Sequence, residues 1–331
     1  MIINRSRNGI IYGALILLAV LAPIVISNEY TRHLLVLTII FSIFGLSYDL
    51  TIGGMGQVSL GHQAFFGLGA YISALLSVRL NVPVWLCLPA AIFGTGILGL
   101  FIGYVSLRTR GAYLAIVMLG FAMILWMIIM GWREVTLGQM GVSGIPPVSI
   151  SIPFLPDLIF DSPLSYYYLA LALLLFVIYF IRRLNQSKLG RAVAGVRENE
   201  ERALLLGINV FSHLLKMFTI AAMVAGLAGF AYAHYIAFVD PKVLSVYYMG
   251  MGLIIVIIGG SGTLFGPLFG AFIFFFVPEW LRIAEDIRLV FFGLVLLAFI
   301  LLMPEGIYPR LVMLWGRLFN RPTQDDQLTA E

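Results

Sequence analysis

Charged side chains are scarce in this sequence. Asp, Glu, Lys and Arg make up 11% of its 331 residues, whereas soluble domains carry about a quarter. Hydrophobic residues reach 61%, and long runs such as 80–107 and 111–132 contain no charged residue at all. A helix that crosses a bilayer needs about 20 mostly apolar residues. The composition therefore argues against a water-soluble fold and predicts several membrane-spanning helices.

Cysteine and catalytic motifs are also lacking. Cys87 is the single cysteine, so this chain can form neither an internal disulfide framework nor a thiolate metal site. The histidines lie far apart in sequence, and no HExxH, CxxC or GxSxG pattern occurs. We therefore predict no catalytic residue, no metal site and no cofactor, and a membrane-embedded enzyme is the least supported of the functional classes.

A phosphate-binding loop is absent as well. The sequence has no GxxxxGK[ST] pattern and no Gly-Lys pair, so it lacks the loop that ordinarily cradles the phosphates of ATP. Any ATP used by this protein must be handled by another subunit.

The apolar runs predict an all-α, polytopic transmembrane bundle. About ten helices absorb all of them, and we place these at 10–26, 34–50, 60–78, 83–107, 112–131, 164–181, 213–238, 244–258, 264–278 and 288–303. The first of these follows Arg5 and Arg7, but Ser27-Asn28-Glu29 makes a poor signal-peptide cleavage site. We therefore expect 10–26 to be a retained helix.

The basic residues indicate an orientation. An even number of helices puts both termini on one side, and that side receives most Lys and Arg residues, including the cluster between Arg182 and Arg202. The opposite side receives Arg32, Arg79, Arg133, Lys242, Arg282 and Arg288. Cytoplasmic loops carry such an excess of basic residues, so we predict cytoplasmic termini.

Two glycine clusters interrupt the apolar pattern, at 53–56 and 259–262. We expect the second to break the charge-free stretch 243–278 into two helices, although a re-entrant hairpin would also fit. Each cluster precedes a glycine-rich helix, which hints at an internal duplication. Helix packing through small residues explains the same glycines without a repeat, namely Gly67, Gly69, Gly266 and Gly270.

A self-sufficient secondary carrier or channel is the main alternative function. Ion-coupled carriers usually keep an ionisable group near the bilayer centre, and the predicted helices place none there. We expect Asp49 and Glu279 to lie at helix ends as ordinary solvated interface residues, and His234 to serve as a polar interface residue and not as a proton relay.

Two segments carry polar groups that point to function. The segment 182–209 reads as a short amphipathic helix on the cytoplasmic side; it suits docking of a partner, and the alternative is a solvated connector. The stretch 52–71 sets Gln57, Ser59, His62 and Gln63 in a glycine-rich apolar context. These side chains could line a translocation path for a polar solute or tie helices together by hydrogen bonds.

At these two segments the sequence resembles the LivM-type permease subunits of branched-chain amino acid ABC importers. The stretch 52–71 is similar to the family signature GxxGQxSLGHxAFFGxGAY, and 190–209 to GRAxxAxRENExxAxxxGIN. The strings GVSGIPP at 141–147 and GGSGTLFGPLFGA at 259–271 resemble two further family motifs, GLxGIP and GGxGTxxGPxxGA. The four motifs occur in the expected order and cover nearly the whole chain.

The resemblance implies the ABC importer permease fold and a role in importing branched-chain amino acids or similar small polar solutes. It also implies partners: a homologous second permease subunit, two cytoplasmic ATP-binding subunits, a periplasmic solute-binding protein and membrane lipid, with no nucleic acid. The protein would lie in the bacterial inner membrane. Residues 1–321 would form one transmembrane permease domain with a cytoplasmic coupling segment at 185–209, and 322–331 a polar cytoplasmic tail.

The coupling segment also resembles the wider EAAxxxG pattern by which importer permeases dock their ATPases. Arg202 stands where that pattern has its middle alanine. The resemblance therefore implies that ATPase coupling involves Arg191, Arg197, Glu198, Asn199, Glu201, Ala203 and Gly207.

Overall fold

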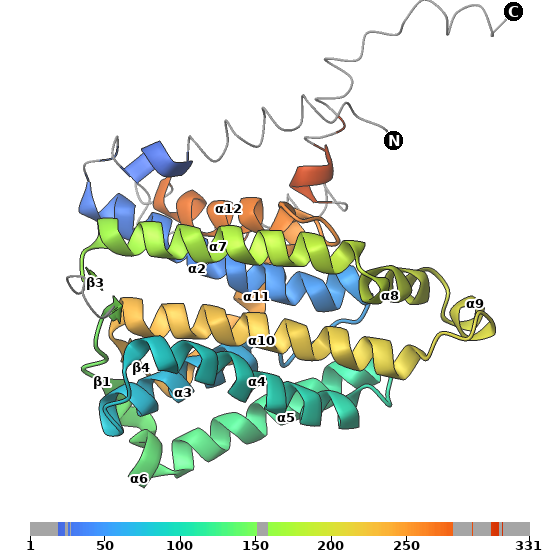
Figure 1. Cartoon of the computed structure of the whole chain (residues 1–331), viewed down its shortest axis with the longest axis horizontal. Helices are drawn as coiled ribbons and strands as arrows, with labels where there is room; N and C mark the ends of the chain where they lie inside the picture. Colours follow the sequence, from blue (N-terminus) through green and yellow to red (C-terminus); the bar gives the residue numbers. More distant parts are fainter. Residues whose placement is uncertain are drawn as a thin grey trace, which may run out of the picture.

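The computed structural model describes residues 19–23, 26, 28–150, 158–280, 293, 306–310 and 313. Within these ranges the chain is predominantly α-helical, as the sequence predicts. The long helices lie side by side along the long axis of the molecule (Figure 1). They are α2 (Glu29–Asp49), α3 (Gln63–Arg79), α4 (Val84–Ser106), α5 (Ala112–Gly131), α7 (Pro163–Gln186), α10 (Val210–Ile236), α11 (Val246–Gly259) and α12 (Gly266–Trp280).

Short elements join the long helices at the two ends of the bundle. One end carries α8 (Lys188–Glu198) and α9 (Glu200–Leu205), and we call it the α8–α9 end. The other, the sheet end, carries α6 (Arg133–Thr136), η2 (Gly138–Met140), η3 (Pro241–Leu244), β1 (Val142–Ser143), β2 (Val148–Ile150), β3 (Leu158–Phe160) and β4 (Phe238–Val239).

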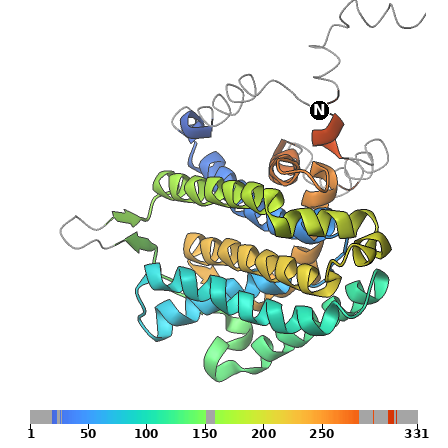
Figure 2. The ribbon, with the colours of Figure 1, turned by 45° about the vertical axis from the view of Figure 1, so that its right-hand side comes forward.

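The strands form two antiparallel pairs that the sequence does not predict. Val142 pairs with Val239, and Val148 pairs with Phe160. The β1–β4 pair joins the connection after α5 to the end of α10, and the β2–β3 pair extends sideways from the helix ends (Figure 2). Each strand is only two or three residues long, which is too short for a visible alternation of apolar and polar residues.

Five of the described helices are long and apolar enough to cross a membrane: Glu29–Gly54, Val84–Ser106, Ala112–Gly131, Pro163–Gln186 and Val210–Ile236. The first includes a π-helical extension of α2, η1 (Leu50–Gly54). The predicted helices 60–78, 244–258 and 264–278 correspond to the shorter α3, α11 and α12. The predicted helices 10–26 and 288–303 lie mostly outside the described residues, as does the tail 322–331.

The helix α10 lies in the middle of the bundle and packs against α2, α3 and α4. Glycines make these contacts close. A Cβ atom on Gly69 would overlap the backbone of Gly226, and one on Gly229 would overlap the carbonyl oxygen of Phe66. Gly67, Gly266 and Gly270 likewise lie against neighbouring atoms. Gly69 and Gly270 lie at helix–helix contacts, in agreement with packing through small residues, whereas Gly266 lies against the α11–α12 loop, and the internal duplication stays a prediction.

The glycine cluster at 259–262 separates two helices, as predicted. The helix α11 ends at Gly259 and α12 begins at Gly266. These two helices pack against each other, and both contact α2. At the sheet end, His234 is buried and its Nδ1 hydrogen-bonds the carbonyl oxygen of Pro146 at 2.7 Å. This contact holds α10 against the β1–β2 connection, and the choice between an interface residue and a proton relay stays a prediction.

Candidate functional site

The polar segment between α7 and α10 forms two helices, α8 and α9. Its start is capped by Ser187, whose Oγ accepts a hydrogen bond from the backbone N–H of Gly190 at 3.2 Å. Asn199 then adopts an extended conformation with φ −160°, and its Oδ1 accepts from the N–H of Arg202 at 2.8 Å. The prediction of one amphipathic helix is therefore wrong. Asn199 interrupts the helix because its short side chain satisfies the first turn of α9 instead.

The segment ends in an exposed apolar tip. Leu205 and Leu206 are 87% and 80% exposed, while Ala203 beside them is buried. Gly207 closes the tip with φ +76°: its N–H donates to Leu204 and the N–H of Ile208 donates to Ala203. This is the Schellman arrangement that favours glycine. Gly207 thus sets the direction in which the chain leaves the tip.

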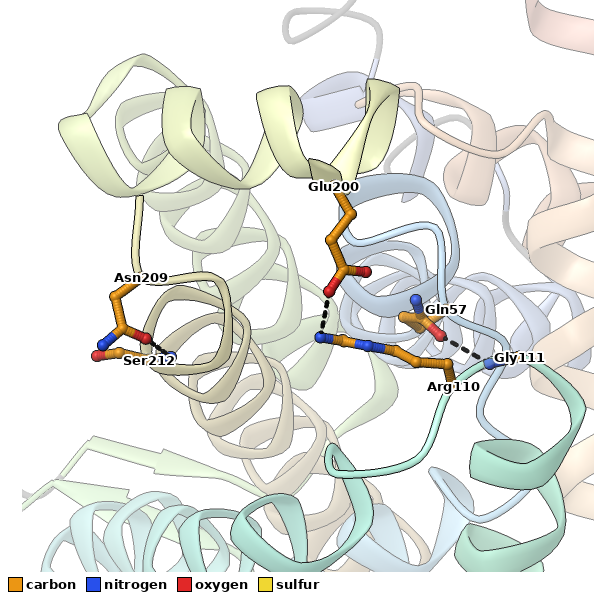
Figure 3. Close-up of polar contacts among 6 residues, drawn as sticks. All are labelled: Gln57, Arg110, Gly111, Glu200, Asn209 and Ser212. Atoms are coloured by element: carbon orange, nitrogen blue, oxygen red, sulfur yellow. Dashed lines mark hydrogen bonds and ion pairs between the residues drawn. The ribbon is translucent and has the colours of Figure 1, made fainter. Parts of the chain in front are cut away.

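The start of α9 is tied to the connection between α4 and α5. Arg110 donates a 2.7 Å hydrogen bond to the carboxylate of Glu200, and the two side chains remain about a third exposed, at 36% and 39%. One residue further along, the N–H of Gly111 donates to Oε1 of Gln57 at 3.3 Å. Figure 3 shows both contacts, together with the cap that Asn209 provides to Ser212 at the start of α10.

A second connection joins α8 to the two glycine clusters. Arg197 donates to the carbonyl oxygen of Gly53, and the N–H of Gly262 donates to Oδ1 of Asp49 at 2.7 Å. A Cβ atom on Gly53 would overlap Gly262. We call these four residues the glycine junction. Three of the sequence motifs, at 52–71, 190–209 and 259–271, therefore meet at one place.

The junction corrects the prediction for Asp49. The sequence suggests an ordinary solvated residue at a helix end, but Asp49 is only 9% exposed. The loop between α11 and α12 folds back over the end of α2 and covers the carboxylate. Glu279, the other residue so predicted, accepts a 2.8 Å hydrogen bond from the hydroxyl of Tyr30.

A cavity of about 500 Å³ lies beside the glycine junction. Its lining carries both signs of charge, with Asp49 and Glu198 opposite in sign to Arg197. Asn185 and Thr263 add uncharged polar groups. The cavity is bordered by α2, α7, α8, α10 and the α11–α12 loop, so a movement of α8 changes its wall.

The predicted path residues separate into two places. Gln57 lies at the α8–α9 end in contact with Gly111. Ser59, His62 and Gln63 are buried inside the bundle, and His62 Nε2 lies 3.2 Å from Ser47 Oγ.

The ring of His62 packs against Phe44, Tyr48, Phe65 and Phe218. Several buried polar atoms near it have no hydrogen-bond partner among the described residues: Ser59 Oγ, His62 Nδ1 and both amide atoms of Gln63. A water, a solute or a residue outside the described ranges can satisfy buried polar atoms of this kind. Their role in a translocation path stays a prediction.

The other predicted coupling residues lie along the α8–α9 segment. Arg191 is exposed on α8 and donates to the carbonyl of Gln186. Glu198 ends α8, and Glu201 is exposed in the first turn of α9. Sequence reasoning did not identify Arg110, Glu200, Gly262 or the buried state of Asp49, because their partners are distant in the chain. The paired glycine clusters were the one available signal.

The model for the family described as branched-chain amino acid transport system / permease component matches residues 30–301. The high-affinity branched-chain amino acid transport system permease protein LivM of Escherichia coli is 32% identical over 317 residues, covering 89% of this chain and 74% of that protein. LivM of Salmonella typhimurium is 30% identical over the same shares.

A more distant relative is the autoinducer 2 import system permease protein LsrC of Yersinia enterocolitica, 23% identical over 68% of this chain and 58% of that protein. A shorter match, 30% identical over 34% of this chain and 32% of that protein, is to the fructose import permease protein FrcC of Rhizobium meliloti. No solved structure matches.

Proposed function

The chain belongs to the family of branched-chain amino acid transport system permease components, and from this we propose that it forms the translocation path of an ATP-driven importer for branched-chain amino acids. Its partners would be a homologous second permease, two cytoplasmic ATP-binding subunits and a periplasmic solute-binding protein. The chain would cross the inner membrane about ten times, with the α8–α9 end and both termini in the cytoplasm. The excess of basic residues at that end supports this orientation.

The observation that carries the proposal is the construction of the α8–α9 segment. Leu205 and Leu206 stand exposed at its tip, where a partner could bury them for about 1.5–3 kcal/mol each. The same segment is tied to the helix ends by Arg197 and by Glu200. An ATP-binding subunit that binds the tip at Leu205 and Leu206 would move the α8–α9 segment when it binds or hydrolyses ATP. That movement would displace the glycine junction and the wall of its cavity.

The buried polar groups support a path for an uncharged or zwitterionic solute. Ser59, His62 and Gln63 offer donors and acceptors without a fixed charge, so they could contact a polar solute without trapping it. The names of the two LivM relatives support branched-chain amino acids as the solute.

The experiment is uptake into proteoliposomes that contain this chain with its second permease and ATP-binding subunits. We expect uptake of leucine, delivered by the solute-binding protein outside the liposomes, to require ATP enclosed inside them, on the cytoplasmic side of the importer. Uptake should stop when the ATP-binding subunits are omitted. Equal uptake without ATP and without those subunits would refute the proposal.

A secondary carrier remains the second candidate because of Asp49. A buried carboxylate beside a cavity is the kind of group that ion-coupled carriers use. An ionophore separates the two functions: collapse of uptake at constant ATP would favour the carrier, and unchanged uptake would favour the ATP-driven importer.

A further inference from the structure

A second cavity, of about 370 Å³, lies at the sheet end of the bundle. It is formed where α10 ends and α11 begins, with β4 and η3 between them. This volume falls within the range of small-molecule sites, about 300–1,000 Å³. If the α8–α9 end is cytoplasmic, as the proposed function holds, this cavity faces the periplasm, where a solute would arrive.

Aromatic rings form most of its wall, from Tyr232, Phe238, Tyr247 and Tyr248. The hydroxyls of Tyr232 and Tyr248 lie 2.9 Å apart and hydrogen-bond each other, which fixes two of the rings. Tyr247 and Phe238 are exposed at the mouth. The cavity is thus preformed on its inner side and open on its outer side.

Further rings close the cavity toward the bundle interior. Phe41 and Phe66 are buried and lie within 6.1 Å, centroid to centroid, of both Tyr232 and Tyr248. On α2, Phe41 precedes Asp49 of the other cavity by eight residues, which corresponds to about 12 Å of helix. An aromatic septum therefore separates the outer cavity from the inner one.

Two side chains of opposite charge line this cavity, Asp240 and Lys242. The side chain of Asp240 is 23% exposed, and its Oδ1 accepts from the backbone N–H of Lys242 at 3.2 Å. Its Oδ2 lies 4.0 Å from Nζ of Lys242, whose side chain is 86% exposed. Such a loose, exposed ion pair contributes little, so Oδ2 can accept a hydrogen bond from a ligand while the ammonium of Lys242 stays available to a second group of the same ligand.

We propose that this cavity receives the solute by its ammonium group and that it selects an amino-acid zwitterion with an apolar side chain. The ammonium donates to Asp240 and lies against the tyrosine rings, whose faces attract cations. The carboxylate of the solute lies toward Lys242 and Ser245, and its apolar side chain contacts the aromatic wall. A sugar has no charge to engage either group, so this site distinguishes the chain from a permease for a neutral solute.

The single cysteine makes a direct test possible. Cys87 is buried, and Cys87→Ala gives a background into which Ser245→Cys places one reactive thiol at the cavity. Ser245 makes no side-chain cap for α11, so the replacement leaves the helix start intact. The rate of modification by N-ethylmaleimide is then measured on the complete importer in proteoliposomes without ATP. Glu134→Cys, exposed on α6 at the same end, is the matched control.

We expect leucine and isoamylamine to slow modification of Ser245→Cys but not of Glu134→Cys. 4-Methylpentanoate and fructose, which lack the ammonium, should not slow it. Asp240→Asn should raise the concentration for half-protection about tenfold for both amines, as loss of a charged hydrogen bond predicts. Lys242→Gln should raise it for leucine alone, because isoamylamine has no carboxylate.

Equal protection by fructose, or protection by leucine that Asp240→Asn leaves unchanged, would overturn the assignment. The absence of any protection in an importer that takes up leucine with ATP would also overturn the assignment. The proposed function would then hold, but without this binding site. If leucine protects the thiol in a preparation whose uptake needs no ATP, the ammonium site is supported. The proposal that ATP drives the transport is then refuted.

Discussion

The backbone N–H of Gly262 donates a 2.7 Å hydrogen bond to Oδ1 of Asp49, 213 residues earlier in the chain. This bond brings the loop between α11 and α12 onto the end of α2. Arg197 reaches the same place from α8 and donates to Gly53. The α8–α9 segment and the two glycine clusters are therefore connected to each other at one point.

The first prediction concerns Arg197. Arg197→Met keeps the aliphatic stem that lies against Gly56 but removes the donor to Gly53, so α8 should move without carrying the helix ends. We expect roughly tenfold less leucine imported per ATP hydrolysed, because a charged hydrogen bond contributes about 1.5–3 kcal/mol. The measurement is the ratio of uptake to phosphate release in proteoliposomes.

Arg197→Lys is its control, since lysine keeps the charge and a donor and should preserve part of the ratio. A normal ratio in Arg197→Met would show that the glycine junction does not transmit the movement.

The second prediction concerns the pair of Arg110 and Glu200. Its side chains are about a third exposed, so solvent screens the pair and its contribution to stability is about 0.2–1 kcal/mol. Arg110→Glu and Glu200→Arg each place like charges together and should each lower ATP-driven uptake. The double replacement restores opposite charges and should recover it. Uptake that stays low in the double variant would mean that the two residues act independently.

The helix positions were the part of the fold that could be predicted from sequence. The predicted 83–107 and 112–131 differ from α4 and α5 by one residue at most, because polar and charged residues interrupt the apolar runs where these helices end. The segment between α7 and α10 was predicted to be helical, but its division into two helices was not, since the break at Asn199 depends on one cap. The convergence at the glycine junction could not be predicted, because each of its contacts joins residues more than 140 positions apart.

The sheet end shows the same limit. Tyr232, Phe238, Asp240 and Tyr248 lie close together in sequence, but the septum residues Phe41 and Phe66 come from α2 and α3. The sequence shows these aromatic residues only as members of separate apolar runs. Tertiary packing brings them together around one cavity.

The third prediction concerns the exposed tip. Leu205→Ser combined with Leu206→Ser should leave the bundle folded, because both side chains are exposed in the isolated chain. If a partner buries them, its affinity should fall by about a hundredfold or more, because burying each leucine contributes about 1.5–3 kcal/mol. The measurement is co-purification of the ATP-binding subunits at graded concentrations. Leu80→Ser, equally apolar and 68% exposed after α3, should not affect it.

The fourth prediction concerns the close contact of α10 with α3. Gly229→Ala places a methyl group onto the carbonyl oxygen of Phe66, so the helices must separate, at a cost of about 1–3 kcal/mol. Gly120→Ala is the matched control, because nothing lies within 4 Å of a Cβ atom there. Alanine favours a helix over glycine by about 1 kcal/mol, so this control should hold or gain stability. Thermal unfolding of the purified chain in detergent measures both, and an equal effect of the two variants would contradict the packing argument.

The last prediction separates the two roles left open for Gln63. Its amide is fully buried, and neither amide atom has a hydrogen-bond partner among the described residues. Leaving such a group unpaired costs about 1–3 kcal/mol, so a purely structural Gln63 would be better replaced by leucine. If the amide instead contacts the solute, Gln63→Leu should reduce leucine uptake while the unfolding temperature stays the same or rises.

Ser73→Ala on the same helix is the control for this prediction. Ser73 is also fully buried, but its hydroxyl already donates to the carbonyl oxygen of Ala70 within α3, so its hydrogen bonding is satisfied within the helix. We expect its replacement to leave uptake unchanged. If Gln63→Leu lowers the unfolding temperature and uptake together, the amide holds helices through a bound water. Loss of uptake without loss of stability, with Ser73→Ala unchanged, would support a place for Gln63 on the path, because the loss then does not come from unfolding.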